Sequence, residues 1–322
     1  MCDRRRILSE SRRKRRYRQR LLLLAAAGVW LLIPADAVAW GPVVHLHCAA
    51  QLLSGAAAAL SPSVLDLLRS CARDFMYGTL AADFVVGKKH AKDIEHCHNW
   101  DVARDLLRAA KEEGPEREAF MLGYINHLGA DVVAHNHTVP QMTVIHYAAK
   151  GVGHIYWEAR ADWRILSLHP EIEELWATQG KLTFPAHDRF LWEHVVPTLF
   201  SHPVSAGIYR GNLVLQRNRV WKNLLSRIDR KSKLHFDQRQ LMLWIHLASQ
   251  SGARAMDNPW SKRLDQLDPI GAASLAWAAD QRKKLRRELR MGGKGAVLSD
   301  LLDDALSHAK TVDIHHFEED WI

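Results

Sequence analysis

The pattern of apolar and polar positions predicts a chain built from amphipathic helices. The strict alternation that is typical of strands is nearly absent. Helices are expected over residues 42–60, 62–75, 101–113, 115–136 and 154–166, with further amphipathic segments around 187–200, 208–228 and 236–256 and a last run from residue 264. The sequence therefore predicts an all-α protein with a single helical domain in its first half and an additional helical C-terminal half.

The apolar run Phe120–Val133 carries the most informative polar positions. His127 and Asp131 are four residues apart and therefore share one face of a helix. His137 lies six residues beyond Asp131, so it joins that face only if the helix ends near Asn136 and the chain curls back. His154 and Glu158 repeat the four-residue spacing on the next expected helix.

A single His-x-x-x-Asp or His-x-x-x-Glu pair is usually a surface ion pair worth a few tenths of a kcal/mol. Here the two pairs stand among apolar residues such as Leu128, Val132, Ile155 and Trp157. An uncompensated carboxylate is costly in such surroundings, so two pairs this close together indicate a buried cation. Imidazole and carboxylate ligands suit zinc.

Further candidate ligands precede this run. Residues 77–84 are expected to be irregular, which leaves Asp83 as either a loop-capping residue or a carboxylate directed at something buried. His96 and His98 alternate, so an extended backbone would turn both to one side. Asp101 is expected to cap the following helix, and His45 stands one turn into the helix that Pro42 opens.

Net charge excludes one class of partner. The chain has 322 residues, 48% hydrophobic positions and a formal charge of +8, but residues 1–39 hold ten Lys and Arg against three acids. That surplus of +7 leaves about +1 for the remainder, which gives no basic footprint for a phosphate backbone. No stable complex with nucleic acid is expected.

Residues 1–39 have the pattern of a secretory signal peptide. An arginine-rich segment to Arg20 precedes an apolar run over residues 21–33, and Ala37-Val38-Ala39 forms a small-residue cleavage site. Cleavage would make the amine of Trp40 a metal donor close to His45 and would release the protein to the periplasm or the medium. The alternative is an uncleaved N-terminal membrane anchor.

Two remaining features leave alternatives open. Cys48, Cys71 and Cys97 could form one disulfide in an oxidising compartment and leave one free thiol. The basic stretch 282–290 is typical of a solvated helix face, with contact to a membrane surface as the alternative.

Taken together, these positions resemble the zinc-dependent phospholipase C family, whose superfamily includes the single-strand-specific zinc nucleases. The resemblance covers residues 40 to about 160 and is most specific in H-x-x-x-D-x-x-x-x-x-H followed by H-x-x-x-E, and then in the tryptophan placed after a signal-peptidase site. It implies a helical fold holding three zinc ions. The five-residue step from Trp40 to His45 is similar to the nucleases, whereas Glu158 is similar to the phospholipases.

The resemblance also implies roles for individual residues. Trp40 and His45 would hold one zinc, Asp131 would bridge it to a second held by Asp83, His98 and His127, and His137, His154 and Glu158 would hold the third. His98 fits the family pattern better than its neighbour His96, and Asp83 is also the candidate to orient or deprotonate the attacking water.

The expected function is hydrolysis of a phospholipid to diacylglycerol and a phosphorylated head group at a membrane surface. The alternatives are a zinc nuclease and a non-catalytic zinc-binding secreted protein. The expected organisation is a signal peptide over residues 1–39, a catalytic region over residues 40–165 and a helical region of unknown role over residues 166–322.

Overall fold

The protein is described from a computed structural model, which places residues 40–55, 60–85, 97–149, 154–179, 183–195, 201–232, 234, 236–292 and 295–310. These residues form helices and connecting turns without a strand, so the all-α prediction is confirmed. The helices are α2 (Pro42–Leu53), α3 (Pro62–Ser70), α4 (Ala72–Ala81), α5 (Trp100–Glu113), α6 (Pro115–Val133), η3 (Ala134–Thr138), α7 (Val139–Ile145), α8 (His154–Leu168), α9 (Pro170–Gln179), α10 (Pro185–His194), α11 (His202–Gln216), α12 (Arg219–Lys231), α13 (Gln238–Asp257), η4 (Leu264–Gln266), α14 (Ala272–Arg290) and α15 (Gly295–Lys310).

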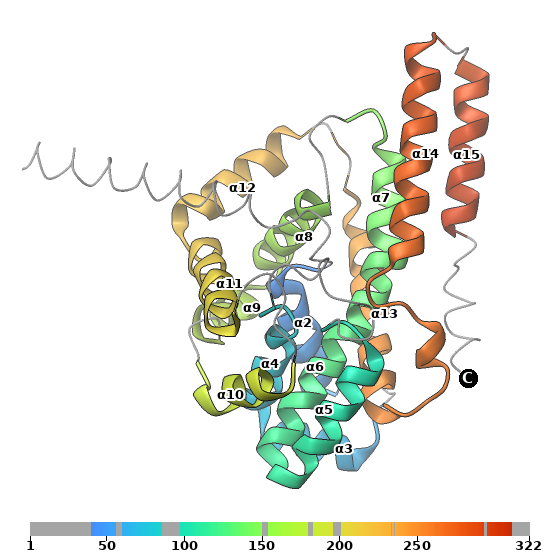
Figure 1. The fold of residues 1–322 in the computed structure, drawn as a ribbon. Coiled ribbons are helices and arrows are strands. Elements are labelled where there is room, and N and C mark those ends of the chain that lie inside the picture. Colours follow the sequence, from blue (N-terminus) through green and yellow to red (C-terminus); the bar gives the residue numbers. More distant parts are fainter. Residues whose placement is uncertain are drawn as a thin grey trace, which may run out of the picture.

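Helix α6 lies at the centre of the main core and contacts α2, α4, α5 and α13 (Figure 1). Every residue from Ala119 to Val133 is buried, which explains why this helix is apolar on all sides instead of amphipathic. Two glycines allow the closest of these contacts. A Cβ on Gly78 of α4 would lie 1.8 Å from the Phe120 carbonyl oxygen, and one on Gly123 of α6 would lie 2.1 Å from the Phe75 carbonyl oxygen.

The main core crosses the boundary between the two halves expected from the sequence. It joins Trp40 and Phe120 to Trp176, Phe190 and Trp244 in one buried cluster. The division into residues 40–165 and 166–322 stays a prediction, but both stretches contribute side chains to the same core. None of the described helices combines the length and apolar character that crossing a bilayer would require.

A second, smaller core lies where α14 and α15 pack on α7. It consists of Val144, Ala278, Leu285 and Ala305 with partly buried neighbours. Arg282 and Arg286 of α14 tie this hairpin to the end of α7: Arg286 Nε donates to the Tyr147 carbonyl oxygen at 2.7 Å, and both side chains donate to the carbonyl oxygen of Ala149. Figure 1 shows the hairpin extending beyond the rest of the molecule.

Several local expectations were wrong. The helix expected over residues 42–60 ends at Leu53, and the helix expected over residues 62–75 is divided at Cys71 into α3 and α4. The helix that begins at Pro115 ends at Val133, and the chain does not curl back near Asn136 but continues through the π-helix η3 into α7. Residues 77–81 are not irregular but form the last turns of α4, where Tyr77 and Leu80 are buried. Asp101 does not cap α5; the cap is Asn99, whose Oδ1 accepts hydrogen bonds from the backbone N–H groups of Asp101 and Val102.

Candidate metal centre

Two helices and two segments that adjoin helices bring the predicted ligands to one buried place. His45 lies on α2, Asp83 follows the end of α4, His98 precedes α5, and His127 and Asp131 lie on α6. Each of these side chains is at most 5% exposed. They form two overlapping groups able to hold a cation, His45 with His127 and Asp131, and Asp83 with His98 and His127, and the ligand atoms of each group lie within 4.8 Å of one another.

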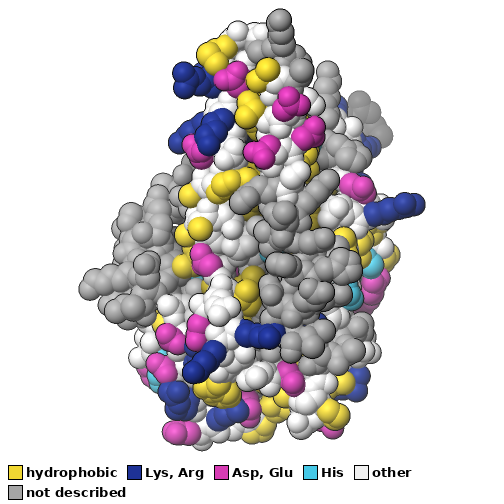
Figure 2. Space-filling model, turned by 90° about the vertical axis from the view of Figure 1, so that its right-hand side faces the viewer, with side chains coloured by type: hydrophobic (Ala, Val, Ile, Leu, Met, Phe, Trp, Pro, Cys, Tyr) yellow, Lys and Arg dark blue, Asp and Glu magenta, His cyan; other side chains and the backbone are white. Residues whose placement is uncertain are grey.

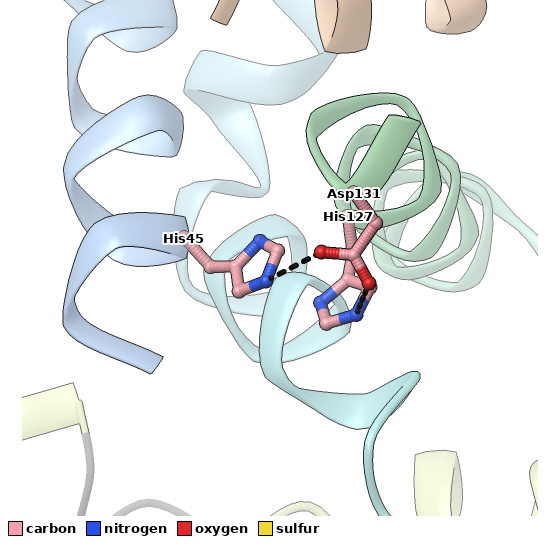
Figure 3. Close-up of side chains that lie close together, drawn as sticks. All are labelled: His45, His127 and Asp131. Atoms are coloured by element: carbon pink, nitrogen blue, oxygen red, sulfur yellow. Dashed lines mark ion pairs between the residues drawn. The ribbon is translucent and has the colours of Figure 1, made fainter. Parts of the chain in front are cut away.

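The two oxygens of Asp131 face different partners. Oδ1 lies 3.2 Å from His45 Nε2, while Oδ2 lies 3.1 Å from His98 Nε2 and 3.2 Å from His127 Nε2. Figure 3 shows the carboxylate of Asp131 beside the imidazoles of His45 and His127, with a dashed line from one oxygen to each ring. A carboxylate turned in this way can bridge two cations, which is the role that the family resemblance implied for it.

Asp83 completes the second group. Its Oδ1 lies 3.5 Å from His98 Nε2 and 3.6 Å from His127 Nε2, and these two ring nitrogens are 3.1 Å apart. Carboxylate and imidazole atoms therefore converge on one point. Asp83 directly follows the last turn of α4, and its N–H donates to the Leu80 carbonyl oxygen. The last turns of α4, which were expected to be irregular, therefore position this carboxylate.

Outer contacts fix the orientation of two imidazoles. His127 Nδ1 donates to the Thr79 carbonyl oxygen at 2.9 Å, which orients the ring so that Nε2 is directed at the carboxylates of Asp83 and Asp131. Next to His98, the Tyr124 hydroxyl donates to the Cys97 carbonyl oxygen and so holds the loop that carries this histidine. The sequence gave no signal for Thr79, because the contact is made by its backbone.

Burial and the neighbouring charges shift the pKa values of Asp131 and His45 toward the protonation states in which these side chains bind metals. Burial alone would raise the pKa of Asp131, but the adjacent His127 and His45 hold it well below its ordinary value. Burial, and then the nearby His127, lower the pKa of His45. Asp131 is thus held in its ionised form, and a buried negative charge of this kind requires compensation.

One observation tests directly whether the residues fit a metal. His45 Nε2 and Asp131 Oδ1 are fully buried and 3.2 Å apart, yet neither makes a hydrogen bond with acceptable geometry among the described residues. The rings of His45 and His127 are stacked with centroids 3.8 Å apart, so both imidazoles approach the carboxylate from the same side. Donor atoms without hydrogen-bond partners, arranged around a carboxylate, fit a zinc ion.

Trp40 lies against the same turn of α6. Its side chain is 2% exposed, and its indole Nε1 donates to the carbonyl oxygen of Ala130, the residue before Asp131, at 3.1 Å. This contact places the expected first residue of the mature chain next to the cluster. The role of its amine as a ligand stays a prediction.

The expected third ion site stays a prediction, because the structure describes the side chains of only two of its three ligands, His137 and Glu158. His137 is half-buried in η3, and burial lowers its pKa to about 4. Glu158 is 5% exposed on α8. The side chain of His154 lies outside the described part of the chain, as does His96, the rival of His98, so neither expectation is tested.

One carboxylate near the centre was missed from the sequence. Asp162 of α8 is 5% exposed and accepts a hydrogen bond from the Val44 N–H at 3.0 Å, and burial raises its pKa to about 8. Its position four residues after Glu158, on the same helical face, was the signal that could have identified it.

The expected disulfide is wrong, since Cys48, Cys71 and Cys97 are all free thiols.

Comparisons with known proteins agree with the geometry. A family model described as zinc dependent phospholipase C matches residues 44–202, a range that includes every predicted ligand except Trp40. No curated protein and no solved structure matches the chain. With five of the predicted ligands brought into one buried cluster, residues 44–202 belong to the zinc-dependent phospholipase C family.

Proposed function

We propose that the protein is an exported zinc-dependent phospholipase C that cleaves phospholipids to diacylglycerol and a phosphorylated head group. The observation that carries the proposal is the placement of the Asp131 carboxylate, with one oxygen toward His45 and the other toward His98 and His127. A bridging carboxylate between two imidazole groups suits a site for adjacent cations, and adjacent cations suit the hydrolysis of a phosphodiester.

In this proposal three zinc ions are bound. Trp40, His45 and Asp131 would hold one, Asp83, His98, His127 and Asp131 would hold the second, and His137, His154 and Glu158 would hold the third. When bound, zinc would supply positive charge for the phosphate oxygens and lower the pKa of a water molecule. Asp83 would orient that water and accept its proton, because its carboxylate already lies at the convergence of two imidazoles.

Export is part of the same proposal. Removal of residues 1–39 would free the amine of Trp40, whose side chain is anchored beside Asp131. Mass spectrometry of the secreted or periplasmic protein should find Trp40 as the first residue. A protein retained with its leader on the membrane would support the N-terminal anchor instead.

The substrate is tested by comparing two phosphodiesters. Purified protein, with and without a chelator, is assayed on a short-chain phosphatidylcholine and on single-stranded DNA. We expect phosphocholine and diacylglycerol from the lipid, complete loss of turnover after chelation, and recovery with added zinc. Faster cleavage of the DNA would indicate the nuclease alternative, and zinc binding without turnover of either substrate would indicate a non-catalytic protein.

The bridging role of Asp131 gives a sharper test. Asp131→Asn keeps the shape of the side chain but removes its charge, so we expect loss of at least one zinc equivalent and a fall in turnover of about a thousandfold or more. Asp105→Asn is the matched control, since Asp105 is exposed and pairs only with Arg108 on the surface of α5. Zinc content by elemental analysis and lipid turnover are measured for both. Full zinc content in Asp131→Asn would overturn the bridge.

A further inference from the structure

Asp162 joins two parts of the centre that are far apart in sequence. It lies on α8 one turn after Glu158, and its Oδ1 accepts a hydrogen bond from the N–H of Val44, the residue before His45, at 3.0 Å. The two partners are 118 positions apart. One buried carboxylate therefore connects the helix that carries His154 and Glu158 to the helix that carries His45.

Helix α2 has no cap of its own. Gly41 occupies the N-cap position and has no side chain, and Pro42 follows it. The first N–H groups of a helix need acceptors when they are buried, and here Pro42, Val43 and Val44 are all buried. The Val44 N–H donates to the Gly41 carbonyl oxygen at 3.1 Å, and Asp162 supplies a second acceptor at 3.0 Å from a neighbouring helix, so α8 takes the place of a side-chain cap at the start of α2.

Gly41 allows the carboxylate to lie directly on the backbone. A Cβ at this position would be 2.1 Å from Asp162 Oδ2 and 2.3 Å from its Cγ. No side chain fits between them. Since Gly41 separates Trp40 from Pro42, the contact fixes the short segment that connects the expected mature N-terminus to His45.

We propose that Asp162 is a positioning residue of the metal centre, which fixes Trp40 and His45 relative to Glu158 and thereby sets the affinity for zinc. The inference rests on the proposed metal-dependent function. Metal ligands on separate helices bind tightly only if the helices keep their relative positions. Replacement of residues that orient ligands typically weakens metal binding about ten- to a hundredfold.

The first experiment compares two replacements of Asp162. Asp162→Ala removes the acceptor, so zinc affinity, measured by competition with a chromophoric chelator, should fall tenfold or more, and the visible spectrum of the cobalt-substituted protein should change. Asp162→Asn keeps an acceptor for the Val44 N–H and should recover most of the affinity. The control is Asp237→Ala, because Asp237 caps only its own helix, α13, at Arg239 N.

A second experiment reaches the same contact from the other side. Gly41→Ala should displace the carboxylate and weaken zinc binding without altering Asp162 itself. In Gly41→Ala/Asp162→Ala the clash is relieved, so the loss of affinity should be clearly smaller than the product of the two single losses. Independent, multiplicative effects would contradict a direct contact between these residues.

The result that would overturn the inference is a folded Asp162→Ala protein with unchanged zinc content and affinity and only a lower melting temperature. If Asp162→Ala does not fold, Asp162→Asn and Gly41→Ala decide the question through the same zinc measurements. Failure of the proposed function is distinguishable, because zinc affinity is read without a substrate. Wild-type protein that binds zinc but cleaves no lipid leaves the role of Asp162 standing, whereas wild-type protein that binds no zinc removes both.

Discussion

The helices around the His/Asp cluster pack through one continuous core, whereas the α14–α15 hairpin packs on α7 through a small separate one. Around the cluster, α4 and α6 approach so closely that only glycine fits at positions 78 and 123. At the turn of the hairpin, Leu289, Met291 and Val297 are 48%, 59% and 49% exposed. Figure 2, which looks onto the hairpin side, shows hydrophobic, basic and acidic side chains interspersed at its upper end.

The difference shows what a buried metal centre requires from its surroundings. Ionisable side chains at 5% exposure or less are held in ligand geometry only where every neighbouring helix is fixed. The hairpin does not have to hold such side chains in place, and its exposed apolar residues lower its stability only slightly. We therefore expect substitutions near the cluster to affect both stability and zinc binding, and substitutions in the hairpin to affect local stability alone.

The largest effect is expected at the contact between α4 and α6. In Gly123→Ala the new Cβ would lie 2.1 Å from the Phe75 carbonyl oxygen and 2.8 Å from the backbone nitrogen of Thr79, so backbone must move. We expect a loss of about 3 kcal/mol or more in the free energy of unfolding, with weaker zinc binding because Thr79 orients His127.

Gly211→Ala on α11 is the matched control. A Cβ there meets nothing within 4 Å, so the same change should raise stability by up to about 1 kcal/mol through helix propensity. Urea denaturation of both variants makes the measurement. Equal stabilities would show that the α4–α6 contact is far less tight than the structure indicates.

A smaller and more local effect is expected in the hairpin. Leu285→Ala removes a side chain that is 1% exposed in the small core, at a cost of about 2 kcal/mol. Hydrogen exchange should become faster in α14 and α15 but not in α6, and zinc content should stay that of the parent. Leu289→Ala, at an exposed position of the same helix, should change little. Loss of zinc in Leu285→Ala would break the distinction between the two regions.

Part of this organisation could be predicted from the sequence. The His127–Asp131 pair followed from helical spacing, because ligands on one helix depend only on local geometry. The approach of His45, Asp83 and His98 to the pair depended on contacts between elements, so it came from the family resemblance and not from spacing. Asp162 was missed because its partner is 118 residues away and is a backbone N–H group.

The smallest effect is expected from replacing Asn99. It tests whether a helix cap next to a candidate ligand influences zinc binding as well as stability. Asn99 and Asn218 both cap helices with Oδ1, α5 and α12 respectively, and replacing either with Ala should cost about 1 kcal/mol. Only Asn99 adjoins a candidate ligand, His98, so only Asn99→Ala should also weaken zinc binding, by several-fold. Thermal unfolding and chelator competition are compared for the two variants. Equal zinc affinities would mean that Tyr124 alone holds the His98 loop.

The π-helix η3 joins α6 and α7 into one long rod and changes the direction in which the side chains of α7 point relative to those of α6. A π turn accommodates one residue more than the α-helical hydrogen-bond frame, and each residue of an α-helix rotates the chain by about 100°. In an uninterrupted α-helix of the same length, Val144 would be turned by about that angle relative to Asp131, whereas the π turn absorbs the additional residue. The segment is thus a phase shift, which lets one rod direct its ligands to the centre and its last turns to α14.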